Sequence, residues 1–598
     1  MCGIFGFTLK YKNPEVGLKK MGDAMIHRGP DGEGYYTDSS ISMGMRRLSI
    51  IDLETGDQPF YNHDKSVVAF CNGEIYNFQE LREDLVQKGY QFISKSDVEV
   101  IPHLYEEYGI AFLEKLNGMF AISLYDKNKD KLFLVRDRLG IKPLYYSIVN
   151  GAIIYSSEIK PILSLNKVKK DVDFNALSIY MDLMYIPTPL SPFEHIKKLD
   201  SGSYLEWGNS EFNILKYWNL SLSDSKKDEN ECVGLLDDLL KDSVKKQLIS
   251  DVPLGSFLSG GVDSSYVTDT AARLSKDEFS VFHMRWKDIE GKIDESVYAH
   301  QVADQHKVKK TFKDANKLDL IDLIPRLIYY LEEPFADAAF IPTYFLAKLA
   351  SCEVKVILSG AGGDELFGGY SRYKNYSAVK SMAGRVIYGR DKKKSYYDVC
   401  KCANRGYWKT FFPWYKADIF KKEFDKNWNQ SKAQDKFNAM MLCDLEYYLR
   451  DDILFMTDKM TMATSLECRV PLLDHRLVEK AQTIPSDYKI RNGEQKYIFK
   501  KIAEKYVPVE VLYRKKEGFG FPIEKWINEH KDLYFDILME KGYLVQNKFI
   551  NLKSLRKIIL KTELTRSESW FYWQIIVLEI WFQLFIVGKK HQDIFNPE

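Results

Sequence analysis

A cysteine at the start of the chain is the first candidate for chemistry. Cys2 directly follows the initiating methionine, so removal of Met1 would place a thiol and a free α-amino group on one residue. An α-amine titrates at about 7.7–8.0, so near neutral pH it can accept the thiol proton. The thiolate is the competent nucleophile. The position therefore predicts a cysteine that its own amine activates.

A turn rich in glycine and serine is the second candidate. An apolar run ends at Leu258, the segment Ser259–Ser265 (SGGVDSS) turns, and a helical pattern follows. Glycines let the backbone approach an anion closely, and a helix N-terminus presents unpaired N–H groups to it. Asp263 can bind Mg2+ through oxygen. The pattern differs from G-x4-G-K-[ST], so γ-phosphate transfer is not implied. It resembles the PP-loop of ATP pyrophosphatases, which release pyrophosphate and leave an acyl-adenylate.

The elements before this turn read as an antiparallel, sheet-rich domain. From Gly3 to about Tyr204, short β-like runs alternate with Gly, Asn and Asp turns. The clearest runs are SVVAF, MFAISLYD, KLFLVRD and AIIYSS. Helical stretches at Phe78–Lys88 and Glu99–Tyr108 are expected on the sheet faces. The polar stretch Asn219–Glu231 has no apolar period and is predicted to be an interdomain linker.

The elements after the linker indicate an α/β domain with a parallel sheet. Helical runs alternate with the buried-strand candidates Pro253–Leu258, Ser280–Met284 and Val354–Leu358. From about Ser371 the chain reads mainly helical and aromatic. The apolar run Trp570–Val587 is nearly long enough to cross a bilayer. It contains two glutamines and a glutamate, which are costly at that depth. We therefore expect a packed helix rather than a membrane span.

The composition excludes several partners. Lys plus Arg number 85 against 84 Asp plus Glu, a formal charge of +1. This balance gives no field toward nucleic acid or an anionic membrane, so neither is expected as a partner. The eight cysteines include no zinc-type C-x2-C pair. We therefore expect a reducing, cytoplasmic location and no structural metal cluster.

Six segments of the first 200 residues form an ordered set. They are MCGIFGF at the start, HRGPDG (His27–Gly32), RRLSIID (Arg46–Asp52), CNGEIYN (Cys71–Asn77), SDVEVI (Ser96–Ile101) and RDRLGIKPLYY (Arg136–Tyr146). Together they resemble the class II, N-terminal-nucleophile (Ntn) glutamine amidotransferase domain. The resemblance implies that the terminal cysteine hydrolyses glutamine through a thioester.

The resemblance also implies roles for individual residues. The Asn72 side chain and the Gly73 N–H would stabilise the oxyanion of the thioester-forming step. Arg47 would bind the α-carboxylate of glutamine, and Glu74 and Asp97 would bind its α-ammonium group.

A second set of segments extends the resemblance to nearly the whole chain. It comprises IDES (Ile293–Ser296), EEPFAD (Glu332–Asp337), VILSGAGGDELFGGY (Val356–Tyr370), TDKMTMATSLECRVPLLD (Thr457–Asp474) and YRKKEGFGFP (Tyr513–Pro522). With the PP-loop, these segments resemble glutamine-hydrolysing asparagine synthetases. The resemblance implies ATP and Mg2+ as cofactors, Asp263 and Asp364 as metal ligands, and Lys516 as the residue that neutralises charge on the adenylate and pyrophosphate. The implied ATP-binding residues are Leu258, Ser259, Gly260, Gly261, Asp263, Ser264, Ser265, Ser359 and Gly360.

One position departs from the family pattern. Where asparagine synthetases usually have Ser-Gly-Glu-Gly, this chain has Ala361 as the third residue. The glutamate of the family is thought to act near the attacking ammonia, and alanine can neither accept a proton nor bind an ammonium. Either Glu365 or Asp364 compensates, or the carboxylate being amidated is not aspartate.

We therefore predict a two-domain enzyme. Residues 2–210 would form an α+β glutaminase domain, an αββα sandwich of antiparallel sheets. Residues 211–231 would be a linker, and residues 232–598 an α/β PP-loop synthetase domain with a helical C-terminal part. Ammonia from glutamine would pass through a dry channel to a β-aspartyl-adenylate, giving asparagine, glutamate, AMP and pyrophosphate. The expected partners are these small molecules and, in a homodimer, a second copy of the chain.

Three other functions compete with this prediction. The nearest is amidation of another carboxylate, such as a sugar uronate in surface-polysaccharide synthesis, which Ala361 favours. β-Lactam-forming relatives share the synthetase fold but need no glutaminase, so the set Cys2, Arg47, Asn72 and Asp97 argues against them. A silent scaffold is disfavoured because both sites keep their chemical residues.

Overall fold

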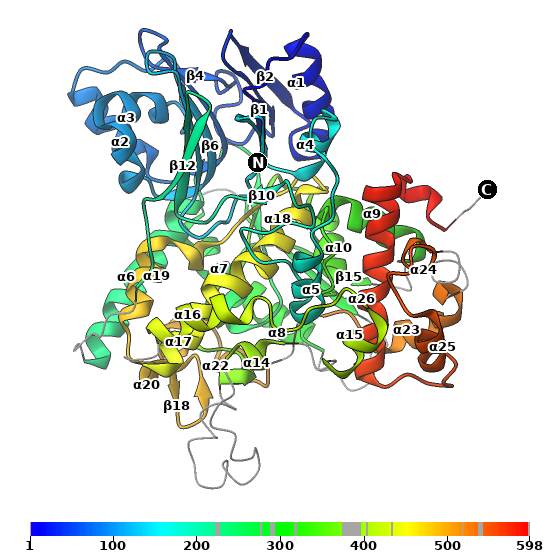
Figure 1. The fold of residues 1–598 in the computed structure, drawn as a ribbon. Coiled ribbons are helices and arrows are strands. Elements are labelled where there is room, and N and C mark those ends of the chain that lie inside the picture. The colour runs from blue at the N-terminus through cyan, green and yellow to red at the C-terminus, as the bar shows by residue number, and fades with distance from the viewer. Residues whose placement is uncertain are drawn as a thin grey trace.

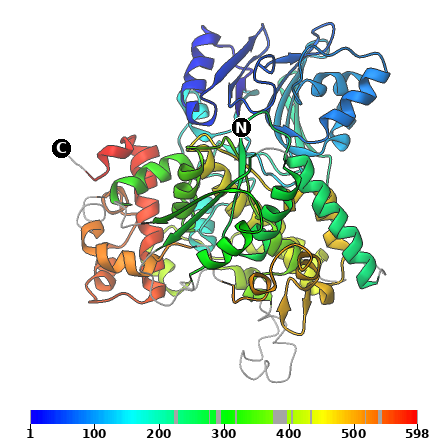
Figure 2. The same ribbon diagram turned by 180° about the vertical axis from the view of Figure 1, so that it is seen from behind.

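The computed structural model describes most of the chain. The described residues are 2–221, 228–275, 278–286, 294–315, 320–373, 396–401, 405–431, 435–516, 518, 520–535 and 542–595. An N-terminal domain built on two sheets sits against a larger C-terminal domain (Figure 1). Strand β1 begins close to the boundary between them in both views (Figures 1 and 2).

Two six-stranded antiparallel sheets form the N-terminal domain. The first has the order β10-β8-β9-β1-β3-β2, with β1 Gly3–Phe7, β2 Gly32–Thr37, β3 Ser42–Arg47, β8 Tyr145–Val149, β9 Ala152–Ser156 and β10 Lys197–Lys198. The second has the order β12-β11-β7-β6-β5-β4, with β4 Phe60–Tyr61, β5 Val67–Ile75, β6 Gly118–Asp126, β7 Lys131–Arg136, β11 Ser203–Gly208 and β12 Glu211–Lys216. The four β-like runs singled out in the sequence are β5, β6, β7 and β9.

Alternate side chains of each strand fill the space between the two sheets, because successive residues point to opposite faces. Ile4 and Met43 of the first sheet share one core cluster with Phe70 and Leu134 of the second. Helices cover the outer faces: α1 (Pro14–Asp23) and α4 (Ile159–Ser164) the first sheet, α2 (Phe78–Gln87) and α3 (Val100–Tyr108) the second. The predicted αββα sandwich is confirmed.

A five-stranded parallel sheet forms the centre of the C-terminal domain (Figure 2). Its order is β15-β14-β13-β16-β17, with β13 Leu254–Phe257, β14 Ser280–Trp286, β15 Lys309–Ala315, β16 Val356–Leu358 and β17 Glu467–Arg469. Val281 packs into the core on the side of α7 (Val262–Leu274), whereas Phe282 packs on the side of α10 (Phe340–Ala350). Both faces are therefore covered, which explains why these strands read as continuous apolar runs.

Helices make up most of the remaining C-terminal domain, as the sequence predicted. They are α5 Phe174–Leu183 (from the end of the N-terminal domain), α6 Glu229–Gln247, α8 Ser296–Ala303, α9 Leu320–Leu331, α11 Gly363–Phe367, α14 Tyr397–Cys400, α15 Arg405–Phe411, α16 Lys421–Ser431, α17 Lys436–Cys443, α18 Phe455–Met462, α19 His475–Thr483, α20 Ser486–Lys489, α21 Tyr497–Ala503, α22 Val509–Leu512, α23 Ile523–Tyr534, α24 Tyr543–Gln546, α25 Leu552–Ile559 and α26 Arg566–Phe582. A short hairpin, β18 Ile490–Arg491 and β19 Glu494–Gln495, precedes α21.

The apolar C-terminal segment is a core helix of this domain. Arg566–Val587 is long and apolar enough to cross a membrane, but 83% of its most apolar window is buried inside the protein. Its polar side chains have internal partners, because Glu579 accepts hydrogen bonds from the N–H groups of Tyr543 and Leu544 at 2.7 and 2.9 Å. Glu579 and Gln574, two of the three interruptions that argued against a membrane span, are thus points where the helix bonds to neighbouring segments.

The predicted linker is shorter than the sequence suggested. Residues 211–216 form β12, which pairs with β11 at the edge of the second sheet. Helix α6 begins at Glu229, and Asp228 and Glu231 form a reciprocal capping box at its start. Both ends of the range 211–231 therefore belong to regular elements. Part of the stretch between them, 222–227, lies outside the described residues.

Candidate active sites

Cys2 lies directly before β1 and is buried in the core between the two N-terminal sheets. Its main-chain nitrogen donates to Asn72 Oδ1 at 3.2 Å, and Asn72 Nδ2 donates to Ser157 Oγ at 3.2 Å. Burial raises the pKa of the Cys2 thiol, and a hydrogen bond from the Leu48 main chain opposes this rise. The structure thus brings Cys2 and Asn72 into direct contact across 70 residues of sequence. Ser157, which the sequence analysis missed, orients the amide.

Gly73 follows Asn72 on β5 and has a backbone that only glycine adopts easily. Its φ is +151°, and a Cβ there would lie 2.0 Å from the carbonyl oxygen of Met119 on the paired strand β6. The absence of a side chain lets β5 and β6 approach closely at this point. The Gly73 N–H consequently keeps a fixed position beside the amide of Asn72.

Arg47 and Asp97, two of the charged residues predicted to bind glutamine, are buried. Arg47 donates to the carbonyls of Ile51 and Asp52 at 3.2 and 2.6 Å and pairs with Asp57 at 2.6 Å. Asp97 accepts a hydrogen bond from the Ile75 N–H at 2.8 Å, and Ile75 directly follows Glu74 on β5. Burial raises the pKa of Asp97 to about 6. A buried carboxylate with a raised pKa favours a cationic partner, which a substrate ammonium would supply.

Burial also raises the pKa of Glu74 well above its ordinary value, and the carboxylates of Glu467 and Asp97 add to the effect. Arg469, from strand β17 of the C-terminal domain, opposes it, with Nη2 3.5 Å from Glu74 Oε2. A residue of the other domain therefore faces the predicted glutamine site. The sequence analysis assigned no role to it.

The second site lies where β13 and β16 end. Parallel strands direct their carboxyl ends to one edge of the sheet, the usual place for a ligand in such folds. Ser259 Oγ lies 2.9 Å from Ser264 Oγ and accepts from the Gly261 N–H at 3.2 Å. Gly260 has a φ of +74°, and a Cβ on Gly360 would lie 2.6 Å from the Ser264 nitrogen. The two predicted nucleotide turns therefore pack against each other.

The nine predicted ATP-binding residues lie on these two turns and at the start of α7. Leu258 directly follows β13, residues 259–261 form the first turn, and Asp263, Ser264 and Ser265 belong to α7. Ser359 and Gly360 begin the second turn, which links β16 to α11. The residues are Leu258, Ser259, Gly260, Gly261, Asp263, Ser264, Ser265, Ser359 and Gly360.

Two carboxylates and two lysines meet beside these turns. Lys496 forms ion pairs with both Asp263 and Asp364, the latter at 2.6 Å, and Lys516 pairs with Asp364 at 2.5 Å. Burial raises the pKa of Asp364, but the attraction of the two lysines outweighs it and lowers the value to about 2. Asp263 Oδ1 has no hydrogen-bond partner among the described residues. This arrangement of cations and oxygen ligands suits a triphosphate with its metal ion.

Lys496 is a residue that the sequence analysis missed. Its side chain is buried, and its backbone has a φ of +57°, a conformation that lysine rarely adopts. Strained backbone of this kind is concentrated at functional sites. Its segment, NGEQKYIFKK, gives no local signal that separates this lysine from the surface lysines around it.

The region of the altered motif contains one buried acid. The Ala361 N–H donates to Ser359 Oγ at 3.3 Å, and four residues further on Glu365 is 1% exposed. Tyr370 donates its hydroxyl to Glu365 Oε1 at 2.5 Å. Burial raises the pKa of Glu365 to about 7, and the nearby carboxylate of Asp364 adds to this rise. Since Asp364 is held as an anion by two lysines, Glu365 is the acid of this pair that can exchange a proton near neutral pH.

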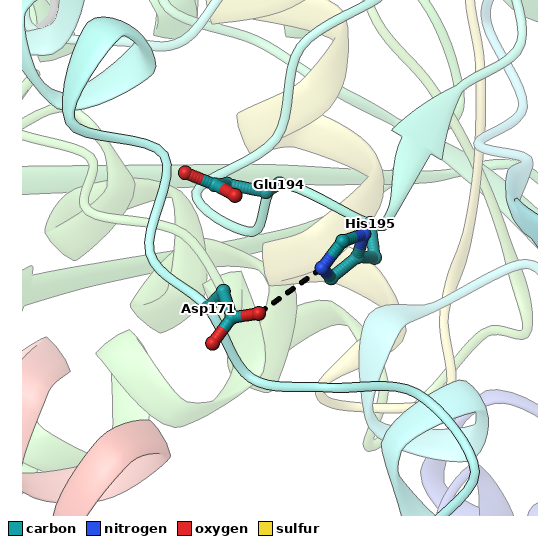
Figure 3. A group of neighbouring side chains, drawn as sticks. All are labelled: Asp171, Glu194 and His195. Carbon is teal, nitrogen blue, oxygen red and sulfur yellow. Dashed lines mark hydrogen bonds and ion pairs between the residues drawn. The ribbon is translucent and has the colours of Figure 1, made fainter.

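A third cluster of ligand-type side chains shares no residue with either site. Figure 3 shows Asp171, Glu194 and His195, all exposed, with His195 Nε2 3.1 Å from Asp171 Oδ2. Exposed acidic groups are commonly found together without an ion. This group is therefore a surface feature of the N-terminal domain.

Taken together, the fold and the two sites define an Ntn-type amidotransferase domain joined to a PP-loop nucleotide-binding domain. Residues 1–218 match the glutamine amidotransferase domain family, and residues 235–583 match the asparagine synthase family. The chain belongs to the asparagine synthase family. It is 35% identical to asparagine synthetase (glutamine-hydrolyzing) 1 of Bacillus subtilis (strain 168), a match that covers 90% of each chain. It is 30% identical to asparagine synthetase B (glutamine-hydrolyzing) of Escherichia coli (strain K12), over 89% of this chain and 84% of that one.

Proposed function

We propose that this protein is a carbon–nitrogen ligase that makes asparagine from aspartate and ATP, with glutamine as the amide donor. One observation carries the proposal: a single chain contains two sites. In the first, the main-chain nitrogen of the buried Cys2 donates a hydrogen bond to the side-chain amide of Asn72. In the second, two carboxylates and two lysines line a PP-loop. The first set suits amide hydrolysis, and the second suits activation of a carboxylate by ATP. The relatives named above are glutamine-hydrolyzing asparagine synthetases, and their matches extend over 89–90% of this chain.

In the glutaminase half, Cys2 would be the nucleophile after removal of Met1. The nitrogen that donates to Asn72 Oδ1 would then be an α-amine on the same residue as the thiol, able to take its proton. Asn72 Nδ2 and the Gly73 N–H would stabilise the oxyanion. Arg47 would bind the α-carboxylate of glutamine, and Glu74 and Asp97 would bind the α-ammonium group of glutamine.

In the synthetase half, the turns after β13 and β16 would bind the phosphates of ATP. Asp263 and Asp364 fit Mg2+, because Asp263 Oδ1 has no other partner in the described chain and both carboxylates face the loop. The ion would offset charge on the pyrophosphate. Lys496 and Lys516 would hold the same phosphate oxygens as the bond to AMP breaks. Ammonia from the first site would then attack the acyl-adenylate in an enclosed space that excludes water.

Glu365 is the residue we propose to accept the proton of the attacking ammonia in place of the family glutamate. Its pKa of about 7 matches that task near neutral pH. Glu365→Gln should lower aspartate amidation by 10²-fold or more, roughly the contribution of a general base. If Glu365→Gln amidates aspartate as fast as the wild type, this role is wrong.

A second candidate acceptor is a sugar uronate, which Ala361 favours because the position lacks the carboxylate usual for aspartate amidation. Carboxylate-dependent exchange between ATP and radioactive pyrophosphate separates the two candidates. We expect exchange with aspartate and none above background with uronates. Exchange with a uronate alone would move the proposal to that acceptor.

Cys2→Ala tests the glutaminase half separately. We expect it to lose glutamine-dependent amidation and retain ammonia-dependent amidation, since the second site does not use the thiol. Cys352→Ala is the matched control, because Cys352 is exposed and is not among the residues assigned to either site. Undiminished use of glutamine by Cys2→Ala would refute the assignment of the nucleophile.

A further inference from the structure

Strand β17 connects the two active sites. It is the edge strand of the parallel sheet and pairs with β16, with Leu358 beside Arg469 in the register. The carbonyl oxygen of Arg469 accepts a hydrogen bond from the Ser359 N–H at 2.9 Å. Ser359 is the first residue of the nucleotide turn after β16. The main chain of Arg469 therefore fixes the point where the strand becomes the turn.

The side chain of Arg469 reaches into the glutaminase site. It is fully buried, and its Nε donates to Glu467 Oε1 at 2.7 Å. Its Nη1 donates to the carbonyls of Gln247 and Ile249 at 2.8 and 2.6 Å. Three bonds therefore hold the guanidinium in one orientation and direct Nη2 toward Glu74. A planar guanidinium fixed in this way acts as a rigid connector rather than as a mobile charge.

The contact between Arg469 and Glu74 is incomplete. Nη2 and Oε2 are 3.5 Å apart, an ion pair that is long for a charge-assisted hydrogen bond. Among the described residues, neither atom has a hydrogen-bond partner. Most buried polar atoms in proteins have a hydrogen-bond partner, so these two atoms are positioned to receive one, such as a substrate group or an ordered water. Glu74 is therefore held ready beside an arginine but still able to accept a hydrogen bond from a substrate.

The charges around this contact have the sign that an ammonium group requires. Glu74, Asp97 and Glu467 are three buried carboxylates, and Arg469 and Lys142 are buried cations that act on them. The pKa values of Glu74 and Asp97 are nevertheless raised, so these two carboxylates would gain from a further cation. The α-ammonium of glutamine would supply that cation, so its binding and the position of Arg469 depend on each other.

We propose that Arg469 is a positioning residue that couples the two active sites, holding Glu74 for the substrate ammonium with its side chain and Ser359 of the nucleotide turn with its carbonyl. This inference rests on the proposed function, because it requires that Glu74 binds glutamine and that Ser359 contacts ATP. A nucleotide that orders Ser359 would fix strand β17 and thereby the guanidinium at Glu74. ATP and glutamine should then alter each other's affinity by the same factor, because such linkage is reciprocal.

The test measures this coupling factor, the ratio of affinities with and without the other ligand, in a variant that cannot hydrolyse glutamine. In Cys2→Ala protein, isothermal titration gives the dissociation constant of glutamine with and without saturating ATP and Mg2+, and that of ATP with and without glutamine. Coupling between sites typically amounts to about 5- to 150-fold, and we expect a factor in this range. In the Cys2→Ala background, Arg469→Met should bring the coupling factor to about 1 and weaken the binding of glutamine. The affinity for ATP in the absence of glutamine should change less than about threefold.

Two further variants keep the test decisive. Arg469→Lys preserves the charge but cannot make the three fixed bonds, so we expect glutamine to bind while most of the coupling is lost. It also replaces Arg469→Met if the latter does not fold. Arg273→Met removes a partly exposed arginine that pairs with Asp269 on α7, and it should leave the factor unchanged.

The possible outcomes separate the inference from the function on which it rests. If wild-type protein forms no asparagine from glutamine, the proposed function is wrong. If it does, and Arg469→Met and Arg469→Lys keep the wild-type coupling factor, only the role of Arg469 is refuted. A factor of 1 in the Cys2→Ala parent would refute coupling altogether.

Discussion

Replacement of Gly73 by alanine tests whether the backbone beside the cysteine has a catalytic role. A Cβ would lie 2.0 Å from the Met119 oxygen and 2.6 Å from the Phe120 Cα, both main-chain atoms of the paired strand. Real Cβ atoms stay at least about 3.0 Å from such atoms, so β5 must move by about 1 Å at this residue. A displacement of that size in a catalytic group lowers rates by roughly 10²-fold. The loss of one oxyanion donor lowers them by about 10²–10³-fold.

We therefore expect Gly73→Ala to reduce glutamine-dependent asparagine formation by about 10²- to 10³-fold. Ammonia-dependent formation should stay within about twofold, because the second site lies in the other domain. Both rates can be measured by coupled pyrophosphate release with glutamine or ammonium chloride. Gly208→Ala is the control, since its Cβ would meet its nearest atom at 3.3 Å at the end of β11 in the same sheet. If Gly73→Ala keeps glutamine activity within threefold of Gly208→Ala, the oxyanion role is refuted.

Three further predictions follow from the geometry. Lys496→Met should lower ATP–pyrophosphate exchange by about 10²-fold or more, as expected for a transition-state charge contact, whereas Lys515→Met, at an exposed position, should not change it. The kcat/KM for glutamine hydrolysis should fall as the pH drops below about 6, because the raised pKa of Asp97 makes this carboxylate neutral there; Asp97→Asn should abolish that acidic limb as well as most activity. Arg28→Met should destabilise the protein by about 3–5 kcal/mol in urea unfolding, because it leaves the buried Asp458 without its main partner; a change under 1 kcal/mol would contradict this.

The elements of the fold were largely predictable because their local patterns match their environments. The run SVVAF lies in a strand buried on both faces, and strands of the parallel sheet appear as apolar runs between helices. The linker was misjudged for local reasons. Asp228 and Glu231 form a capping box whose D-x-x-E spacing the sequence does contain. The strand Glu211–Lys216 has the sequence EFNILK, with apolar residues at the alternate positions Phe212 and Ile214, but it is short and exposed along its whole length.

The candidate sites were predictable only where their residues belong to recognisable motifs. Lys496 and Arg469 were not assigned because their roles depend on tertiary contacts. Lys496 meets Asp263 across 233 residues of sequence, and only the packing of α21 against the two turns brings them together. Arg469 is part of a segment that resembles the family, but its role depends on β17 being the edge strand next to β16. Sequence spacing alone does not fix the order of strands in a parallel sheet.

Arg28 and Arg469 are two of the buried arginines that link the domains, and both contact the proposed glutaminase site. Arg28 pairs with Asp458 of the C-terminal domain at 2.8 Å and donates from Nε to the Cys2 carbonyl at 3.1 Å. Arg469 belongs to the C-terminal domain and pairs with Glu74 of the N-terminal domain. Buried ion pairs add little net stability, but breaking one is costly, so they fix orientation more than they strengthen the fold.

Because one bridge ends at the proposed nucleophile and the other at the predicted ammonium site, a shift between the domains would disturb both parts of the first site at once. Release of ammonia would then depend on the domain arrangement that the second site requires. An amidotransferase gains from this dependence, since ammonia released without a waiting adenylate is protonated in water and lost as a nucleophile.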